Sequence, residues 1–377
     1  MFITAAFLRP DDKGMYMKYV DEYRDGGLAQ ELVSRIRKAS KTPIRLMEIC
    51  GTHTMAIFRH GIRSLLPNHI ELVSGPGCPV CVTSMEEIDR CVKLATEPGV
   101  IVTTFGDMLR VPGSGDSLQK QAGRGADVRM VYATLDALRI AGENPDRNVV
   151  FLGIGFETTA PTVAAAVKAA GDRGIGNFSV LSAHKLLPPA MEALVSAGDL
   201  GIDGFLCPGH VSTIIGTASY ADVASRFGIP CVVAGFEPVD ILQSILMLVH
   251  QIEAGEARAE NQYTRAVAPE GNPAALHLLD EVFVPCDSTW RGLGPIPSSG
   301  LALRDEFAAH DARALFDLEI PPAREPAGCR CAEVLKGTIR PPDCPLFRKV
   351  CTPRSPVGAC MVSTEGTCAA YFKYHTP

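Results

Sequence analysis

Short apolar runs alternate with amphipathic stretches of helical length between about residues 42 and 254. An apolar run of four to six residues is typical of a buried strand, and its alternation with helices predicts βα units and a mainly parallel sheet. The expected strands form two successive sets: Ile44–Ile49, Ile70–Val73, Val100–Thr104 and Val128–Tyr132, then Val149–Ile154, Phe178–Leu181, Gly204–Cys207 and Cys231–Ala234.

The two sets resemble each other. Leu-Met-Glu-Ile-Cys-Gly-Thr-His-Thr (46–54) aligns with Phe-Leu-Gly-Ile-Gly-Phe-Glu-Thr-Thr (151–159), and each segment reads as a strand that runs into a loop opening a helix. This alignment indicates either an internal duplication or the general likeness of any two βα units. In both cases the sequence predicts an α/β fold with two similar parallel-sheet domains, at residues 42–145 and 146–256.

The regions on either side of these domains have a different character. Residues 1–41 read as a charged helical segment, which we expect to pack with the C-terminal domain. From about residue 265 prolines multiply and helical periodicity weakens, and six cysteines lie in the last fifty residues. Since metal–ligand bonds can replace a missing core, we predict a loop-rich, cysteine-rich third domain over residues 257–377 that a metal cluster holds together.

Composition excludes several classes of protein. The net charge of −6 argues against a nucleic-acid-binding surface. The chain contains no run of about 18 uncharged apolar residues, which argues against a membrane span, and its first residues lack the pattern of a secretory signal peptide. We therefore expect a cytoplasmic protein, whose thirteen cysteines a reducing compartment keeps available for metals or redox chemistry.

The C-terminal cysteines carry a spacing signal. They contain no C-x2–4-C knuckle of the kind that zinc ribbons use, and compact bacterial ferredoxin spacing is also absent. Four dispersed thiolates on loops favour a single cuboidal iron–sulfur cluster, with a structural zinc or simply buried cysteines as alternatives. Two cysteines are left over, and they could form a redox-active disulfide. The six are Cys329, Cys331, Cys344, Cys351, Cys360 and Cys368.

A C-x-x-C motif lies at the start of a predicted helix. Cys78 and Cys81 stand in Gly-Pro-Gly-Cys-Pro-Val-Cys, after an expected strand and before a capping box at Ser84 to Glu87. A helix N-terminus lowers thiol pKa values because the helix dipole favours the thiolate. The pair could bind a metal, cycle through a disulfide or be half of a zinc knuckle.

A second thiol follows the first expected strand. Cys50 ends that strand and His53 lies in the next turn, so the two could be a nucleophile–base pair or two metal ligands, or Cys50 could simply be buried. Because the Cys50 and Cys78 loops follow strands of one predicted sheet, they should share its carboxyl edge. Glu157 and His210 could face Cys50 across a cleft, or be satisfied structural groups.

Together these segments resemble the HypD family of hydrogenase maturation factors, and the resemblance covers nearly the whole chain. The matching segments are Cys50-Gly-Thr-His-Thr, Gly75-Pro-Gly-Cys-Pro-Val-Cys81, Gly155-Phe-Glu-Thr-Thr159, Pro208-Gly-His-Val-Ser212, Cys329-x-Cys331, Pro342-Asp-Cys-Pro-Leu-Phe347, Pro356-Val-Gly-Ala-Cys-Met-Val-Ser363 and Glu365-Gly-Thr-Cys-Ala-Ala-Tyr371.

The resemblance implies a scaffold with redox capability on which the Fe(CN)2CO group of nickel–iron hydrogenases is assembled. Such a scaffold works with the small partner HypC and receives cyanide through HypE and HypF. Cys50 would hold the iron, with Cys78 and Cys81 as a nearby redox or iron-supporting pair. His53, Glu157 or His210 could then hydrogen-bond a cyanide nitrogen.

The resemblance also implies roles for the C-terminal cysteines. Four of them would bind a [4Fe–4S] cluster: Cys329, Cys344, Cys351 and Cys368. Cys331 and Cys360 would then be the pair that forms a disulfide.

Two other functions remain open at this point. One is a free-standing iron–sulfur thiol–disulfide oxidoreductase that uses Cys78 and Cys81. The other is a zinc-stapled interaction protein without a redox role. Cys50 distinguishes the scaffold from the oxidoreductase, because only the scaffold needs a third thiol as an iron ligand.

Overall fold

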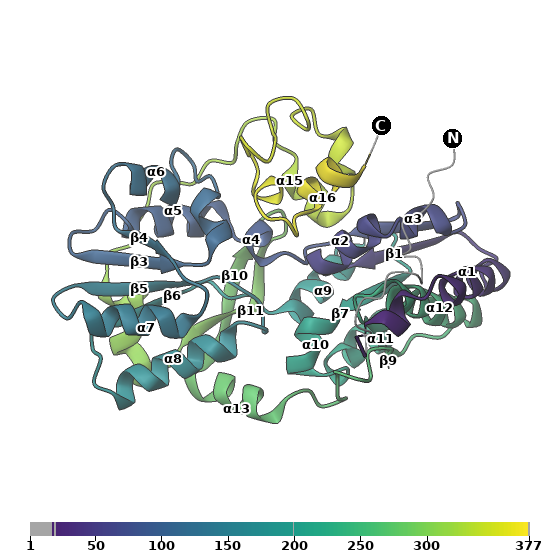
Figure 1. Cartoon of the computed structure of the whole chain (residues 1–377), viewed down its shortest axis with the longest axis horizontal. Coiled ribbons are helices and arrows are strands. Elements are labelled where there is room, and N and C mark those ends of the chain that lie inside the picture. Colours follow the sequence, from purple (N-terminus) through teal and green to yellow (C-terminus); the bar gives the residue numbers. More distant parts are fainter. Residues whose placement is uncertain (1–16, 19, 199, 376–377) are drawn as a thin grey trace.

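The computed structural model describes residues 17–18, 20–198 and 200–375 of the chain. Within these residues, strands and helices form two parallel sheets covered by helices on both faces, an antiparallel hairpin, and a loop-rich C-terminal segment (Figure 1). This arrangement confirms the predicted α/β class. Part of the expected N-terminal helical segment lies outside the described residues.

All eight expected strands form, with bounds close to those predicted. They are β1 (Ile44–Glu48), β2 (Ile70–Ser74), β3 (Val100–Thr104), β4 (Val128–Met130), β5 (Asn148–Gly153), β6 (Phe178–Ser182), β7 (Gly204–Pro208) and β8 (Cys231–Ala234). A further strand that the pattern did not indicate, β9 (Ala259–Asn261), pairs with β8.

The sheets are not built from successive halves of the chain, which corrects the domains expected at 42–145 and 146–256. The first sheet has the order β2-β1-β7-β8-β9 and the second has the order β4-β3-β5-β6. Each sheet therefore takes strands from both expected domains. Apolar patterning locates strands along the chain, but it carries no information on which strands pair.

The strand orders support an internal duplication. If β1 and β2 correspond to β5 and β6, and β3 and β4 to β7 and β8, then β2-β1-β7-β8 in one sheet matches β6-β5-β3-β4 in the other. The first two strands of each half pair with the last two strands of the other half. The aligned segments 46–54 and 151–159 then occupy equivalent places in the two sheets.

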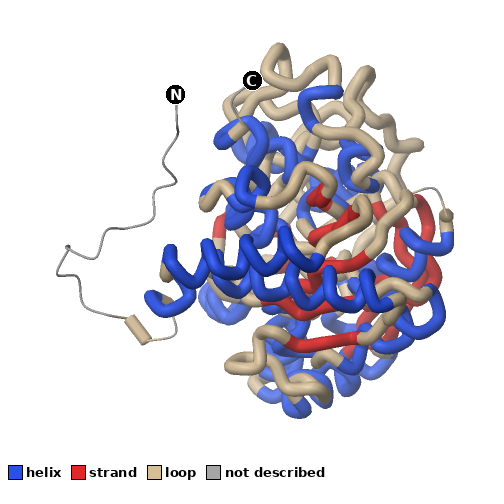
Figure 2. The backbone as a smooth tube through the Cα atoms, turned by 90° about the vertical axis from the view of Figure 1, so that its right-hand side faces the viewer, coloured by secondary structure: helices blue, strands red, loops and turns tan. Residues whose placement is uncertain are grey.

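Helices cover both faces of the first sheet, and the side chains of alternate strand residues pack against them. Figure 2, in which the right-hand side of Figure 1 faces the viewer, shows helices lying across these strands. One face carries α1 (Gly26–Ala39), α2 (Gly51–Arg59), α3 (Ile62–Leu65) and α12 (Pro238–Ala254). The other carries α9 (Leu187–Ser196), α10 (Gly209–Ile215) and α11 (Ala221–Phe227), with the short η3 (Ala218–Tyr220) between the last two.

The second sheet is covered in the same way. One face packs against α7 (Thr134–Glu143), α8 (Ala160–Asp172) and α13 (Pro273–Val282). The opposite face packs against α5 (Met85–Leu94), η2 (Gly106–Arg110), α6 (Leu118–Gly123) and α14 (Ala312–Leu315), the last of which follows η4 (Asp305–His310).

The N-terminal segment packs on an α/β unit, which corrects the expectation that it joins the C-terminal domain. After η1 (Asp21–Arg24), helix α1 lies along α12 of the first sheet. Arg24 donates a hydrogen bond of 2.8 Å from Nη2 to Glu237 Oε1, at the start of α12. Apolar residues on one face of α1 complete the core beneath it.

The C-terminal region begins later than residue 257. The hairpin β10 (Phe283–Trp290) and β11 (Gly294–Leu303) packs against α9 and joins the core of the second sheet. The cysteine-rich segment follows, with η5 (Pro341–Asp343), η6 (Ala359–Met361), α15 (Cys331–Lys336) and α16 (Thr367–Tyr374). It contacts α2, β2 and the short α4 (Pro79–Val82). Across the described ranges, no helix is long and apolar enough to cross a membrane.

Candidate functional site

Two cysteine loops meet at the carboxyl edge of the first sheet, as the sequence predicted. Cys50 follows β1 and is the N-cap of α2, while Cys78 follows β2 and is the N-cap of α4. Since β1 and β2 are parallel neighbours, both loops leave the same edge. A Cβ atom on Gly77 would lie 2.2 Å from the Cys50 nitrogen, so only glycine permits this approach.

Cys78 and Cys81 form a disulfide across the first turn of α4, with their Cα atoms 5.2 Å apart. The Cys81 sulfur lies 3.9 Å from the carbonyl oxygen of Ala359 in the cysteine-rich segment. The disulfide thus lies between the Cys50 loop and the C-terminal cysteines.

Cys50 is a buried free thiol, with 7% of its surface exposed. Burial raises its pKa to about 12, although backbone N–H groups of His53 and Thr52 favour the thiolate. A metal ion bound here would displace the thiol proton, because thiolate is the ligand form.

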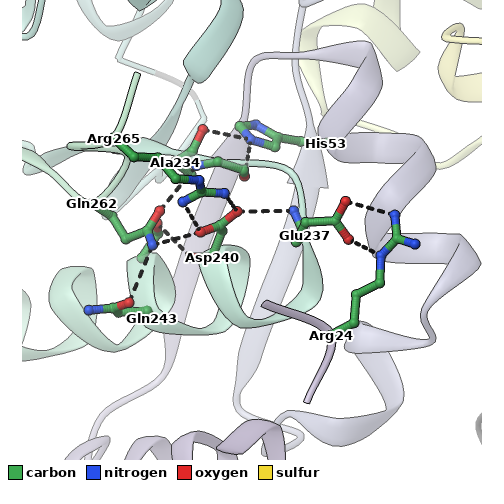
Figure 3. Close-up of polar contacts among 10 residues, drawn as sticks. Arg24, His53, Ala234, Glu237, Asp240, Gln243, Gln262 and Arg265 are labelled. Atoms are coloured by element: carbon green, nitrogen blue, oxygen red, sulfur yellow. Dashed lines mark hydrogen bonds and ion pairs between the residues drawn. The ribbon is translucent and has the colours of Figure 1, made fainter. Parts of the chain in front are cut away.

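Two histidine rings, His53 on α2 and His210 on α10, pack against the ring of Phe236. The Phe236 ring centroid lies 4.8 Å from that of His53 and 3.9 Å from that of His210. Burial lowers the pKa of His53 to about 4, which leaves its imidazole neutral. Its Nε2 lies 3.2 Å from the carbonyl oxygen of Ala234 and 3.0 Å from that of Gly235 (Figure 3).

Glu157 lies beside a cavity that is formed by other elements than the Cys50 loop. Its Oε1 accepts a hydrogen bond of 2.8 Å from the Leu187 backbone nitrogen, and its other oxygen has no hydrogen-bond partner among the described residues. Burial raises its pKa to about 7. The side chain lines a mainly apolar cavity of about 480 Å³ whose other walls include α9, α13 and the hairpin. In the described part of the chain it makes no hydrogen bond to the Cys50 loop, and no residue of that loop is among those that line the cavity.

Four C-terminal thiols gather beside this edge. Burial raises the pKa of the Cys351 thiol, and the neighbouring Cys368 and Cys344 thiols add to the shift. A hydrogen bond with Cys331 raises the pKa of Cys329, with further contributions from burial and from Cys344. These four are the residues that the resemblance assigned to a cluster.

The arrangement of these four thiols bears on which metal group they could hold. Among the described residues, no three His, Cys, Asp or Glu side chains are arranged to hold a single metal ion. Four thiolates are a donor set that both a structural zinc and a cuboidal iron–sulfur cluster accept.

The two remaining C-terminal thiols lie closest together. The sulfur atoms of Cys331 and Cys360 are 2.8 Å apart, and both side chains are buried free thiols. A small movement would bring them to bonding distance.

Sequence reasoning missed several residues of this edge. Glu365 accepts a hydrogen bond of 2.7 Å from the Thr52 hydroxyl, although 313 positions separate the two residues. Buried Arg291 donates to the carbonyl oxygen of Thr83 just after α4, and it lowers the pKa of Cys331 alongside the stronger effect of the Cys329 and Cys360 hydrogen bonds. The position of Glu365 in Glu-Gly-Thr-Cys was a signal, whereas nothing around Arg291 pointed to this place.

Comparisons with known proteins agree with the geometry. A family model described as "HypD: Hydrogenase formation hypA family" matches residues 27–375. The hydrogenase maturation factor HypD of Azotobacter vinelandii is 50% identical over 367 residues, which cover 95% of this chain and 97% of that protein. This chain belongs to the HypD family. The family member from Escherichia coli (strain K12) is 47% identical over 366 residues, covering 95% of this chain and 98% of that protein.

The HypD family is thus a family of hydrogenase maturation factors, and this chain matches it over almost its full length. The family resemblance rested on loops that are far apart in the sequence. In the fold, the Cys50 and Cys78 loops, His210 and the C-terminal cysteine segment converge on one edge of the first sheet.

Proposed function

We propose that this HypD-family chain is the scaffold on which the Fe(CN)2CO group of nickel–iron hydrogenases is assembled, with the iron held by Cys50. The single observation that supports this most is the meeting of a buried free thiol, a second cysteine pair and a cysteine-rich segment at one sheet edge. Low-spin iron with cyanide and carbonyl ligands is soft, and thiolate is a suitable soft ligand.

The chain's own residues would act on this iron substrate in distinct ways. Cys50 gives up its proton and binds, while Glu365 and Thr52 tie its loop to the C-terminal segment. Reduction of the Cys78–Cys81 disulfide takes two electrons and two protons and yields two thiols, which then stand beside the iron site.

A [4Fe–4S] cluster would supply these electrons one at a time from an external electron donor. Its proposed ligands are Cys329, Cys344, Cys351 and Cys368, whose thiols influence one another as described above. Cys331 and Cys360 would be the disulfide-forming pair next to the cluster, since their sulfur atoms are 2.8 Å apart.

The proposed partners are the small protein HypC, together with HypE, which delivers cyanide made with HypF. The proposed setting is the cytoplasm, where a reducing environment maintains free thiols.

A second function deserves comparison because one contact favours it. The Cys78–Cys81 disulfide lies next to Ala359, the residue before Cys360, so electrons could pass between the two cysteine pairs without an iron substrate. This protein would be a free-standing iron–sulfur thiol–disulfide oxidoreductase. Cys50 would have no role in that reaction.

An infrared spectrum of the anaerobically purified protein, produced together with its small partner, separates the two functions. We expect cyanide and carbonyl stretching bands from the unchanged protein, and their loss in Cys50→Ala. Cys91→Ala is the matched control, because Cys91 is also a buried free thiol but lies in the core of the second sheet. A spectrum without such bands from protein that carries its cluster would favour the oxidoreductase.

A further inference from the structure

His53 is held in a single tautomer by the backbone around it. Its Nε2 lies within hydrogen-bonding distance of the carbonyl oxygens of Ala234 and Gly235. Carbonyl oxygens only accept hydrogen bonds, so Nε2 carries the hydrogen of the neutral ring. The other ring nitrogen, Nδ1, therefore presents a lone pair.

No donor among the described residues forms a hydrogen bond with this lone pair. Nδ1 is buried and has no hydrogen-bond partner among the described residues, and only 1% of the His53 surface is exposed. Buried polar atoms are normally satisfied, so an orphan of this kind needs an explanation. Without a hydrogen, Nδ1 cannot donate to the nitrogen of a cyanide, which removes the hydrogen-bonding role considered from the sequence.

His53 lies in the same helical turn as Cys50. Cys50 is the N-cap of α2 and His53 is the third residue of that helix. A side chain at this third position can reach back to the N-cap residue, as capping boxes show. The thiol of Cys50 and the imidazole of His53 thus belong to one helical turn.

We propose that His53 is a second protein ligand of the iron that Cys50 holds, binding it through Nδ1. This inference rests on the proposed scaffold function. A histidine that binds a metal through one ring nitrogen usually donates its other N–H to a backbone carbonyl or carboxylate, and His53 makes this contact before any metal is present.

A buried polar network fixes the two carbonyls that orient the ring (Figure 3). The backbone nitrogen of Gly235 donates to Gln262 Oε1 at 3.1 Å, and Gln262 Nε2 donates to Asp240 Oδ1 at 2.9 Å. Asp240 is fully buried and accepts two hydrogen bonds from Arg265, of 2.8 and 2.6 Å. The Phe236 ring packs against the His53 ring at an interplanar angle of 32°. The ring is therefore preorganised for ligation by residues that do not touch the iron.

The test compares His53→Ala with the unchanged protein, each produced with the small partner and purified without oxygen. In His53→Ala we expect the cyanide and carbonyl bands to shift together or to disappear. Added imidazole, which can enter the vacated space, should restore the original positions. His60→Ala, at the other end of the same helix, is the control and should leave the bands in place.

Gln262→Leu tests the outer network separately. It keeps the imidazole but removes the partner of the Gly235 nitrogen, and we expect iron to dissociate about 10–100-fold more readily. Iron K-edge absorption of the unchanged complex should show the outer-shell scattering of one imidazole ring, which Cys50→Ala and His53→Ala both remove.

The outcomes distinguish a failure of the scaffold function from a failure of the His53 ligand assignment. If the unchanged protein carries no cyanide or carbonyl bands, the scaffold function itself fails. If those bands are present and depend on Cys50, but His53→Ala leaves them unmoved, only the ligand assignment is overturned. Bands that vanish in a folded His53→Ala protein and do not return with imidazole also overturn it, because His53 is then structural.

Discussion

The backbone nitrogen of Gly51 donates a hydrogen bond of 3.1 Å to the carbonyl oxygen of Gly77, which joins the two loops that carry Cys50 and Cys78. The contact requires small residues on both sides. A Cβ on Gly51 would lie 2.5 Å from Glu365, and a Cβ on Gly77 would lie 2.2 Å from the Cys50 nitrogen. The relative position of the two cysteines is therefore set by backbone packing and not by side-chain contacts alone.

Gly77→Ala is expected to destabilise the protein by about 1–3 kcal/mol or more, because the new methyl group meets backbone atoms that cannot rotate away. Gly142→Ala is the matched control. Gly142 is exposed in α7 with no atom near a built Cβ, and alanine there should stabilise by about 0.5–1 kcal/mol. Urea unfolding measures both. A Gly77→Ala protein as stable as the unchanged chain would contradict the close approach.

The pH dependence of stability should reveal buried Glu157. Burial raises the pKa of this carboxyl to about 7, from about 4.5 for a glutamate in an unfolded chain. Its contribution to stability is therefore present below pH 4.5 and is lost as the pH rises towards 7. In the same range burial lowers the pKa of His53 to about 4, so its contribution is present above pH 6.5 and is lost as the pH falls. The two effects oppose each other.

The variant Glu157→Gln removes the titration of the buried carboxyl and leaves that of His53 in place. Relative to the unchanged protein, its free energy of unfolding should rise with pH by up to about 1.4 kcal/mol per pH unit between about pH 5 and 6.5, and then level off above pH 7. Urea unfolding at a series of pH values measures the slope. The exposed Glu143→Gln should leave the slope unchanged. An equal slope in Glu157→Gln would mean that the carboxyl titrates normally.

Two arginines that pair with residues near the start of α12 should differ sharply in importance. Arg265 pairs with Asp240, whose side chain is 0% exposed. Arg265→Met would leave that charge buried without its cation, at a cost of about 3–5 kcal/mol. Arg24 pairs with Glu237 where both side chains are partly exposed, so Arg24→Met should cost about 1 kcal/mol or less. Chemical denaturation of the two variants gives the comparison, and similar losses would argue against the buried network.

The cluster ligands can be tested by absorption and iron content. Cys344→Ala is expected to lose the brown iron–sulfur spectrum, because a cuboidal cluster needs four thiolates. Replacing Cys331 and Cys360 together should leave that spectrum in place, since they are not proposed ligands. A full spectrum from Cys344→Ala would refute the ligand set, and a zinc content of one ion per chain would refute the cluster.

Patterning located the strands well because burial in a parallel sheet imposes apolar runs of limited length. It also placed Cys50 and Cys78 at one edge, since neighbouring parallel strands carry their following loops to the same side. The same patterning did not show which strands pair with each other. Nothing in Val100–Thr104 distinguishes a neighbour of β1 from a neighbour of β5, so the exchange of strands between the two sheets went unforeseen.

The sequence likewise indicated some residues of the candidate site and gave no sign of others. Cysteine spacing and motif sequences indicated Cys50, the Cys78–Cys81 pair and the C-terminal thiols, because these residue types carry their chemistry with them. The sequence left open whether Glu157 faces Cys50, since a motif does not show which way a buried carboxyl points. Arg291 and the Asp240–Arg265 pair carried no local signal, as charged residues are usually solvated.

The sequence by itself determined the α/β class, the strands and the set of thiols, because burial periodicity and side-chain chemistry are local properties. Only the tertiary structure decided which strands share a sheet, that Glu365 reaches Thr52, and that His53 offers Nδ1 and not an N–H. These features depend on contacts between residues far apart in the sequence, and a chain folds them together through packing that no single segment encodes.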